Sequence, residues 1–278
     1  MTVPHVTRFS DVGIRGSSHK ADVYLPRRMD RDTTVLVNFH GGGWYTGDKS
    51  LASLCCAELA RRGLIVVNAN YGIREEDPVP LMVADSIAAI AWVRAGTGLP
   101  DGVGAAASEG ICLAGDSAGS HIAALASAAL REPELADLLH LGSSIVANAG
   151  DVSSLVSWSG ALSLGELVVD ENHPDRERFN GYVESIGGGS RDRLSRLDPL
   201  SWLSERTPPV LAFTSALDFF HDATTSYVAA AVSAGYLATE VDYDGTHPAC
   251  KHSWQLDPDL AESRETYDLT AEFAKAHR

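Results

Sequence analysis

Positive charge is scarce in this sequence. Its 278 residues include 22 Lys and Arg against 37 Asp and Glu, which gives a formal net charge of −15. Nucleic acids and anionic membranes bind positive protein surfaces, so the composition disfavours both as partners. It also disfavours a strongly anionic substrate. Solubility is sufficient to explain the excess of acidic residues.

Long apolar runs and cysteines are also few. No segment approaches the ~20 apolar residues needed to cross a bilayer, and Met1–Ser10 lacks the apolar core of a signal peptide. The four cysteines, Cys55, Cys56, Cys112 and Cys250, show no metal-ligand spacing. Reduced cysteines used in packing are typical of the cytoplasm, so we expect a cytoplasmic protein with no metal and no organic cofactor.

The sequence does contain short buried runs that alternate with longer amphipathic segments. Strands are predicted at Thr34–Phe39, Leu64–Ala69, Ile111–Ala114, Val152–Ser157, Val210–Ser215 and Thr239–Tyr243, with an antiparallel strand near an edge at Lys20–Leu25. Helices are predicted at Lys49–Arg62, Leu81–Val93, Ala118–Arg131, Asp222–Ala234 and Asp259–Ala276. This pattern predicts an α/β fold, with a mostly parallel central sheet and helices on both faces.

Two segments lack a clear helix or strand pattern. Gly102–Ala107 consists of small residues and is predicted to be a surface loop. Asp170–Arg196 is polar and glycine-containing, and we expect it to be an insertion over one end of the sheet. We therefore predict a single domain, residues 1–278, in which residues from about 160 to 200 form a short cap-like insertion.

The strongest chemical signal is the G-x-S-x-G motif GDSAG at residues 115–119, between a predicted strand and a predicted helix. In that context the serine lies on a sharp turn that exposes its hydroxyl, and the glycines avoid side-chain clashes. The following helix points its N-terminal N–H groups toward developing negative charge. Ser117 is therefore the predicted nucleophile of an acyl-transfer reaction.

A second signal, HGGGW at residues 40–44, directly follows a predicted strand. Consecutive glycines let backbone N–H groups approach a ligand closely. An oxyanion needs such donors, each of which contributes about 2.7–4 kcal/mol. Glycine-rich loops also bind phosphates, but no G-x-G-x-x-G motif or Walker lysine follows here.

A serine nucleophile needs a base, and the base needs a carboxylate that orients it. Asp218 comes just after the predicted strand Val210–Ser215 and is the predicted acid. Asp222 lies slightly further on and suits the N-cap of the next helix.

Several histidines are candidates for the base. His247 and His252 both fall in the loop between the last predicted strand and the last predicted helix, so spacing does not separate them. His121 and His221 sit beside the nucleophile and the acid, and we expect them to be structural.

The segments HGGGWYTGDK (40–49) and GDSAGSH (115–121) resemble α/β-hydrolase carboxylesterases, and the resemblance covers most of the chain. The most similar branch contains feruloyl-esterase-like and arylformamidase-like enzymes, which are related to hormone-sensitive-lipase-type esterases. The resemblance implies an α/β-hydrolase fold and cleavage of a carboxylic ester through an acyl-enzyme.

The resemblance also implies roles for particular residues. DFFHD at 218–222 is similar to the family's D-P-L-R-D, whose first Asp is catalytic, and HSW at 252–254 is similar to its H-G-F. Residues 246–251 then look like a short insertion. The implied catalytic residues are Ser117, Asp218 and His252, and the implied oxyanion donors are the backbone N–H groups of Gly42, Gly43 and Ala118.

The substrate class follows from what covers the pocket. In the hormone-sensitive-lipase branch a long helical cap precedes the HGGG segment, which begins here at residue 40. We expect the roof to come from residues 170–196, from loops near Trp44 and Tyr71, or from a partner subunit in a homo-oligomer. This favours a small-molecule ester with a small or aryl acyl group. An amidase, a formamidase or an acyltransferase would use the same triad, and a non-catalytic binding protein of this fold is a further alternative.

Overall fold

A computed structural model gives the structure of the chain, and it describes residues 6–14, 17–30, 32–73 and 78–278. Within these residues, eight strands form one sheet in the order β1-β2-β4-β3-β5-β6-β7-β8. The strands are β1 (Thr7–Gly13), β2 (Lys20–Leu25), β3 (Val35–Phe39), β4 (Ile65–Ala69), β5 (Ile111–Asp116), β6 (Ser154–Trp158), β7 (Val210–Ser215) and β8 (Ala238–Tyr243). Only the pairs β1–β2 and β2–β4 are antiparallel in this sheet, so the predicted mostly parallel sheet is confirmed.

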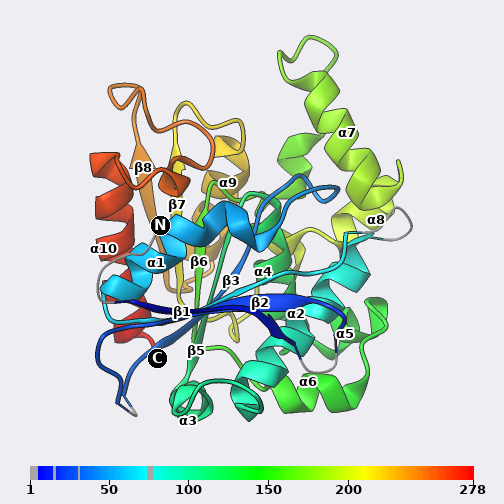
Figure 1. Cartoon of the computed structure of the whole chain (residues 1–278). Helices are drawn as coiled ribbons and strands as arrows, with labels where there is room; N and C mark the ends of the chain where they lie inside the picture. Colours follow the sequence, from blue (N-terminus) through cyan, green and yellow to red (C-terminus); the bar gives the residue numbers. More distant parts are fainter. Residues whose placement is uncertain (1–5, 15–16, 31, 74–77) are drawn as a thin grey trace.

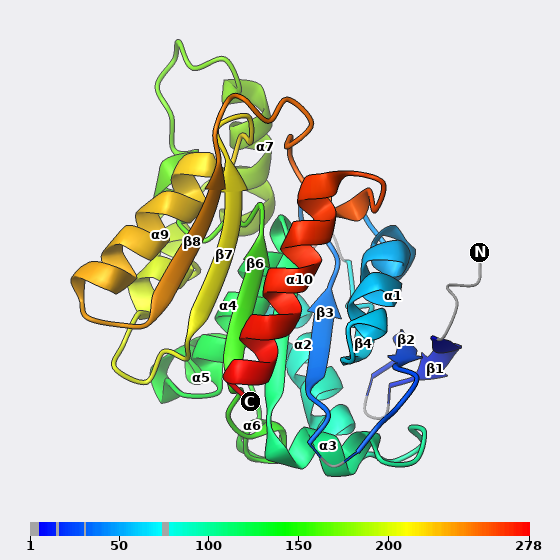
Figure 2. The same ribbon diagram turned by 90° about the vertical axis from the view of Figure 1, so that its left-hand side faces the viewer.

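Helices cover both faces of the sheet (Figures 1 and 2). They are α1 (Ser53–Arg61), α2 (Pro78–Ala95), α3 (Val103–Glu109), α4 (Ala118–Ala129), α5 (Pro133–Leu138), α6 (Ser143–Ala149), α7 (Arg176–Gly187), α8 (Arg191–Arg196), α9 (His221–Ser233) and α10 (Ala261–Ala276). Short 3-10 helices are η1 (Lys49–Ala52), η2 (Leu164–Leu167), η3 (Pro199–Trp202) and η4 (Trp254–Leu256). Helices α1 and α10 pack on one face, while α2, α4 and α9 pack on the other.

The central strands are apolar on both sides because both faces are covered. All five residues of β3 are buried. Val35, Val37 and Phe39 face the core beneath α2 and α4, whereas Leu36 faces the core beneath α1. Burial of each such large side chain contributes roughly 1.5–3 kcal/mol. These strands therefore form a rigid platform for the loops that follow them.

The parallel direction of the strands brings the chemically important loops to one edge of the sheet. Strands β3, β5 and β7 run in the same direction, and Phe39 at the end of β3 is in register with Gly115 near the end of β5. The HGGGW segment, the GDSAG turn and the loop with Asp218 follow these three strands. In open α/β sheets, ligand sites form outside the carboxyl ends of the strands.

Two predicted segments differ from the structure. Gly102–Ala107 is not a loop, because α3 spans Val103–Glu109 and buries Val103, Ala106 and Ala107. Packing against the core outweighs its glycine content. The polar segment 170–196 is more regular than its sequence indicated, since it contains α7 and α8. Figure 1 shows these two helices above the edge of the sheet where the parallel strands end.

Three further elements have no counterpart among the predicted ones. The strand β1 is almost entirely exposed and lies at the sheet edge, and α5 and α6 are short. The remaining predicted helices and strands are confirmed, with ends that differ by a few residues. Among the residues that the structure describes, no helix combines the length and the apolar character that a membrane crossing requires.

Candidate active site

Ser117 lies at the turn between β5 and α4. Its backbone has φ 54° and ψ −123°, a conformation that L-residues rarely adopt. A Cβ at Gly115 would overlap the backbone of Gly119, and a Cβ at Gly119 would overlap the carbonyl oxygen of Phe39. The turn therefore requires glycine on both sides of the serine, and it holds the Ser117 side chain at the carboxyl edge of the sheet.

The structure brings Ser117, His252 and Asp218 together. The Ser117 Oγ lies 2.9 Å from Nε2 of His252, and Nδ1 of His252 lies 2.8 Å from Oδ1 of Asp218. Ser117 and Asp218 are buried, whereas the His252 side chain keeps about a fifth of its surface exposed. A hydroxyl, an imidazole and a carboxylate in this order form the arrangement in which the imidazole acts as the base for a serine and the carboxylate orients the imidazole.

The carboxylate of Asp218 is fixed by two donors. Oδ1 accepts hydrogen bonds from the His252 imidazole and, at 2.9 Å, from the backbone N–H of Phe220. Burial favours the neutral acid, but the hydrogen bond and charge of His252 outweigh burial and hold the pKa of Asp218 below its usual range. Asp218 is therefore ionised near neutral pH.

Asp222, the other acid considered from the sequence, lies outside this arrangement. It is not the N-cap of α9, since that position belongs to Phe220. Asp222 lies in the first turn, where its exposed carboxylate contacts Nδ1 of His221 at 3.0 Å. The helix begins one residue earlier than predicted, at His221, and the Asp218 carboxylate accepts the N–H of its N-cap residue, Phe220.

The remaining candidate histidines have other partners. His247 Nδ1 lies 3.0 Å from Oε1 of Glu262 in α10. His221 lies between the carboxylates of Asp222 and Asp242. His121 is fully buried in α4. Of the four candidates, His252 is the one whose imidazole contacts the Ser117 hydroxyl.

The backbone of Gly42 and Gly43 turns sharply after β3. Their φ angles are 138° and 62°, and a Cβ at Gly42 would overlap the carbonyl oxygen of Thr46. The N–H groups of Gly42, Gly43 and Ala118 donate no hydrogen bond to any other described residue. Ala118 is the first residue of α4, so its N–H has no acceptor within the helix. These donors remain available for a ligand.

Asp116 is a residue whose importance the sequence motifs did not indicate. Its buried carboxylate accepts the N–H of Gly41 at 3.0 Å on Oδ1 and the hydroxyl of Ser253 at 3.3 Å on Oδ2. Burial raises its pKa, although the charge of His252 and these hydrogen bonds oppose the rise. Asp116 thus links the HGGGW loop to the residue after His252. The acid directly before the motif serine is a sequence feature that could have indicated this role.

Trp44 and Tyr71, the residues assigned from the sequence to the substrate pocket, are 1% and 3% exposed. The Trp44 indole N–H donates to Nδ1 of His121 at 3.0 Å, and the Tyr71 hydroxyl donates to the carbonyl of His40 at 2.7 Å. The Tyr71 ring also stacks on the His40 imidazole at 4.4 Å. Both rings are therefore buried by packing: Trp44 contacts His121 from within the HGGGW loop, and Tyr71 packs against His40 at the start of that loop.

Other aromatic rings lie closer to the reactive groups. Phe219 contacts the His252 imidazole with a centroid distance of 3.9 Å, and Phe220 lies 5.4 Å from it. Tyr182 of α7 packs against Trp44 and Phe220, and together with Tyr45 it lies over Gly43. The helix α7 therefore contributes an aromatic side chain to the surroundings of the glycine loop.

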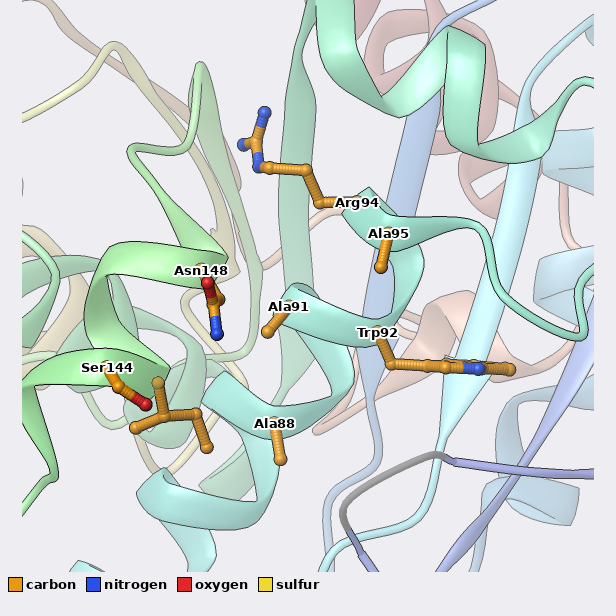
Figure 3. A pocket seen from close by; sticks show the side chains of 8 residues that line it. Ala88, Ala91, Trp92, Arg94, Ala95, Ser144 and Asn148 are labelled. Carbon is orange, nitrogen blue, oxygen red and sulfur yellow. The ribbon is translucent and has the colours of Figure 1, made fainter.

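A separate surface pocket of about 570 Å³ lies between α2 and α6 and contains none of these residues (Figure 3). Its walls include Ala88, Ala91 and Trp92. Its cation, Arg94, donates hydrogen bonds to the carbonyl groups of Ala149 and Asp151. Because this arginine is occupied by the backbone, the pocket has no charged group available to hold a polar ligand.

The topology and the serine turn together define an α/β hydrolase. The chain belongs to the BD-FAE family, whose model matches residues 21–230. A curated relative, the isoprenylcysteine α-carbonyl methylesterase ICME of Arabidopsis thaliana, is 31% identical over 243 residues, which cover 82% of this chain and 53% of the relative. The chain spans about half the length of the curated relatives it matches.

Solved structures agree on the fold. Inhibited esterase B from Lactobacillus rhamnosis has a TM-score of 0.83 at 19% identity, with 99% of this chain and 88% of that chain covered. A hyperthermophilic esterase from Pyrobaculum calidifontis has a TM-score of 0.75 at 25% identity, with 99% and 86% covered. The α/β-hydrolase fold expected from the motifs is thus confirmed.

Proposed function

We propose that this protein is a serine carboxylesterase that cleaves a carboxylic ester with a small or aryl acyl group through an acyl-enzyme. The observation that carries the proposal is the continuous contact from Ser117 through His252 to the buried Asp218, at 2.9 and 2.8 Å. Membership of the BD-FAE family and the likeness to esterases over most of the chain support it.

The contacts of His252 define its proton positions. Asp218 is an acceptor only, so the Nδ1 of His252 carries the proton that it donates to Asp218. Nε2 is then unprotonated and accepts the Ser117 hydroxyl proton as the oxygen attacks the ester carbonyl. The ionised Asp218 stabilises the imidazolium that results.

The first half-reaction forms an acyl-enzyme. The carbonyl oxygen becomes an oxyanion, which the N–H groups of Gly42, Gly43 and Ala118 stabilise. The imidazolium of His252 returns its proton to the leaving alcohol as the C–O bond breaks, and an acyl group remains on Ser117. Water then attacks this acyl group with His252 as base, which releases the acid and restores the Ser117 hydroxyl.

The aromatic side chains around His252 support a substrate with a small or aryl acyl group. Phe219, Tyr182 and Tyr45 lie around the imidazole and the glycine loop, where flat apolar groups pack well. We propose that the chain is one domain and that residues 160–200 act as its cap, with Tyr182 as the residue that limits acyl size. Trp44, within the HGGGW loop, and Tyr71, which packs against His40, would hold that loop in its conformation.

Substrate size tests the role of the cap. Replacement of Tyr182 by Ala should raise kcat/KM for long or branched acyl esters relative to the acetate ester by about 10-fold, because it opens space beside Gly43. Phe9→Ala, on the exposed strand β1, is the control. Equal changes for short and long esters would remove Tyr182 from the proposed pocket.

Two alternatives keep the same machinery. An amidase or formamidase must protonate a poorer leaving group, and an acyltransferase passes the acyl group to an alcohol instead of water. Turnover of matched aryl ester and N-formyl or anilide substrates distinguishes an amidase or formamidase from an esterase. Diversion of the acyl group by added alcohols identifies an acyltransferase.

A cytoplasmic location also belongs to the proposal, and the four free, buried cysteines support it.

The decisive experiment compares wild type, Ser117→Ala, His252→Ala and His221→Ala. Short p-nitrophenyl esters report turnover, and a fluorophosphonate probe reports an activated serine. We expect turnover and labelling in the wild type and in His221→Ala, loss of both in Ser117→Ala, and loss of turnover by at least about 10⁴-fold in His252→Ala. Wild-type protein that neither hydrolyses nor labels would favour the non-catalytic binding protein.

A further inference from the structure

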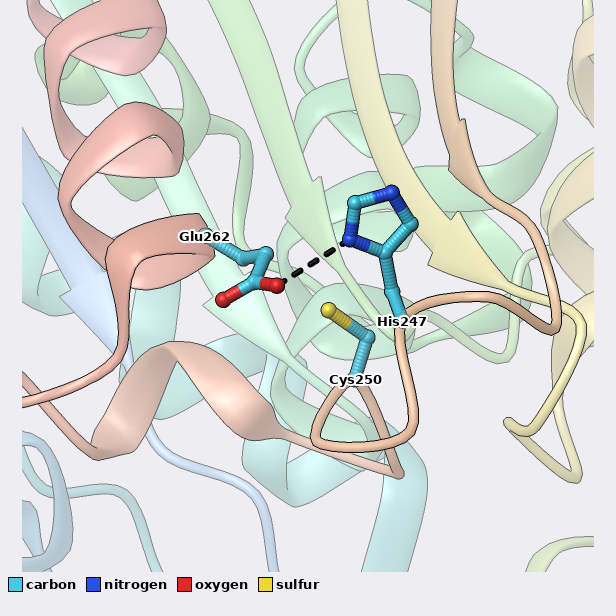
Figure 4. A group of neighbouring side chains, drawn as sticks. All are labelled: His247, Cys250 and Glu262. Carbon is cyan, nitrogen blue, oxygen red and sulfur yellow. Dashed lines mark hydrogen bonds and ion pairs between the residues drawn. The ribbon is translucent and has the colours of Figure 1, made fainter.

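Three side chains of types that can bind a metal ion lie together near His252, outside the proposed catalytic triad. His247 and Cys250 lie in the loop between β8 and η4, and Glu262 lies in the first turn of α10 (Figure 4). One ligand atom from each lies within 4.8 Å of the other two. In Figure 4 the sulfur of Cys250 points into the space between the imidazole and the carboxylate.

Each of the three side chains is held by its surroundings. The Nδ1 of His247 lies 3.0 Å from Oε1 of Glu262, and the imidazole packs against the edge of Tyr243 at 5.3 Å. The backbone N–H of Cys250 donates to the carbonyl of His247 at 3.0 Å, which closes the loop into a tight turn. This turn spaces His247 and Cys250 as H-x-x-C.

Cys250 is the least expected member of this group. It is 0% exposed, and its sulfur makes no hydrogen bond with any other described residue. Such a thiol is a poor nucleophile at neutral pH. A role in acyl transfer is therefore not supported, whereas coordination to a cation would favour the thiolate.

We propose that His247, Cys250 and Glu262 bind one Zn²⁺ ion. Zinc takes nitrogen, sulfur and oxygen ligands at about 2.0–2.3 Å, so tetrahedral ligands lie roughly 3.3–3.7 Å apart. The His247–Glu262 contact is already as close as 3.0 Å, and small rotations of the side chains bring the third atom into range. Mg²⁺ and Ca²⁺ prefer oxygen ligands, so a thiolate and an imidazole select against both.

The zinc ion would connect two separate elements. Cys250 lies two residues before His252, and its carbonyl accepts the hydroxyl of Ser215 at the end of β7. Glu262 belongs to the helix α10, which packs on the sheet beside α1. Coordination would therefore tie the loop that carries His252 to α10, with water in the fourth position because the His247 side chain is 40% exposed. Binding breaks the His247–Glu262 hydrogen bond, and the imidazole proton moves from Nδ1 to Nε2 so that Nδ1 can bind zinc. The Cys250 proton is displaced to solvent as the sulfur–zinc bond forms.

The test uses the untagged full chain after treatment with a chelator. Titration with Co²⁺, a spectroscopic substitute for Zn²⁺, should give one equivalent of binding and a thiolate-to-cobalt charge-transfer band that Zn²⁺ displaces. At free Zn²⁺ of 100 times its Kd, the equilibrium constant for unfolding should fall about 100-fold. Neither measurement needs a substrate, so the result is independent of the proposed esterase activity.

Matched variants locate the ion. Cys250→Ser should abolish the charge-transfer band and the zinc-dependent stabilisation, and Glu262→Gln, at a partly exposed position, should weaken binding at least 10-fold without threatening the fold. Cys112→Ala, which removes another buried thiol, and His221→Ala, which removes another imidazole between carboxylates, should bind as the wild type does. Absence of stoichiometric binding in the wild type, or binding unchanged in both Cys250→Ser and Glu262→Gln, would overturn the proposal.

Discussion

The serine turn and helix α7 of the proposed cap differ in how their residues are constrained. At residues 115–119 every side chain is buried, and backbone atoms of β3, β5 and α4 approach so closely that glycine is required. In α7, by contrast, only Phe179, Ile186 and Gly187 are buried. Contact between backbones restricts residue type strongly, whereas an exposed helix restricts it weakly. The turn therefore produces a recognisable motif, and the cap does not.

Among the changes that test this contrast, the largest effect should come from breaking the hydrogen-bond network around the serine turn. Asp116→Ala removes the acceptor for Gly41 N–H and for the Ser253 hydroxyl, so the glycine loop and the His252 loop lose a shared anchor. We expect kcat/KM for p-nitrophenyl acetate to fall about 10²-fold, because small misplacements of catalytic groups cost that much.

A conservative change separates anchoring from general damage. Asp116→Asn keeps an acceptor for the Gly41 N–H, so it should retain more activity than the alanine variant. Circular dichroism and the urea midpoint of both variants report on folding. Full activity in Asp116→Ala would mean that the two loops hold their positions without this carboxylate.

The next largest effect should come from a steric overlap within the serine turn, at Gly119. A methyl group at Gly119 would overlap the carbonyl oxygens of Phe39 and His40, which belong to backbone that cannot move aside easily. Gly119→Ala should therefore lower the free energy of unfolding by about 1–3 kcal/mol in urea titrations. A variant as stable as the wild type would show that α4 can shift away from β3 at little cost.

The difference between tightly packed and exposed segments also determines which parts of the fold the sequence predicts. The buried runs of β3, β4 and β7 were predictable because a strand that is covered on both faces is apolar along its whole length. The strand β1 was missed because its side chains are exposed, and α3 because its burial depends on tertiary packing.

The candidate active site shows the same difference between features that local sequence indicates and features that depend on tertiary contacts. Ser117, Asp218 and His252 were named from the motifs and the resemblance, and the structure brings these three together. The role of Asp116 and the cluster around Cys250 were missed, because both depend on contacts between segments distant in the chain. The spacing of the cysteines alone does not indicate a metal site, because Cys250 pairs with a histidine, His247, as H-x-x-C.

The pH dependence of stability should depend on His121, which contacts both Trp44 of the HGGGW loop and Leu197 after α8. Its Nδ1 accepts the Trp44 indole N–H, and its Nε2–H donates to the carbonyl of Leu197 after α8, so the buried ring must be neutral. Burial lowers the pKa of His121 to about 4, against an ordinary value of 6.5. Between these values the unfolded chain takes up a proton that the folded chain does not.

The stabilisation from His121 is therefore complete above pH 6.5 and is lost as the pH falls toward 4. From pH 7 to pH 5 the free energy of unfolding of the wild type should fall by up to about 2 kcal/mol more than that of His121→Gln, which has no titrating ring at this position. Urea unfolding of both proteins at the two pH values measures this difference. Identical pH dependence in the two proteins would exclude His121 as its source.

The smallest effect should distinguish two glycines of the cap itself. Gly181 lies inside α7, and Gly188 follows the helix with φ 54°; a Cβ would meet no atom within 4 Å at either position. Gly181→Ala should stabilise the helix by about 0.5–1 kcal/mol, because alanine loses less backbone entropy on folding. Gly188→Ala should destabilise it by about 1 kcal/mol, since a side chain disfavours the left-handed conformation. Amide exchange within residues 176–187 measures both changes. Opposite signs at these two equally open positions would show that backbone conformation determines which residues α7 and its C-terminus accept, whereas steric contact determines this in the serine turn. Equal signs would contradict this distinction.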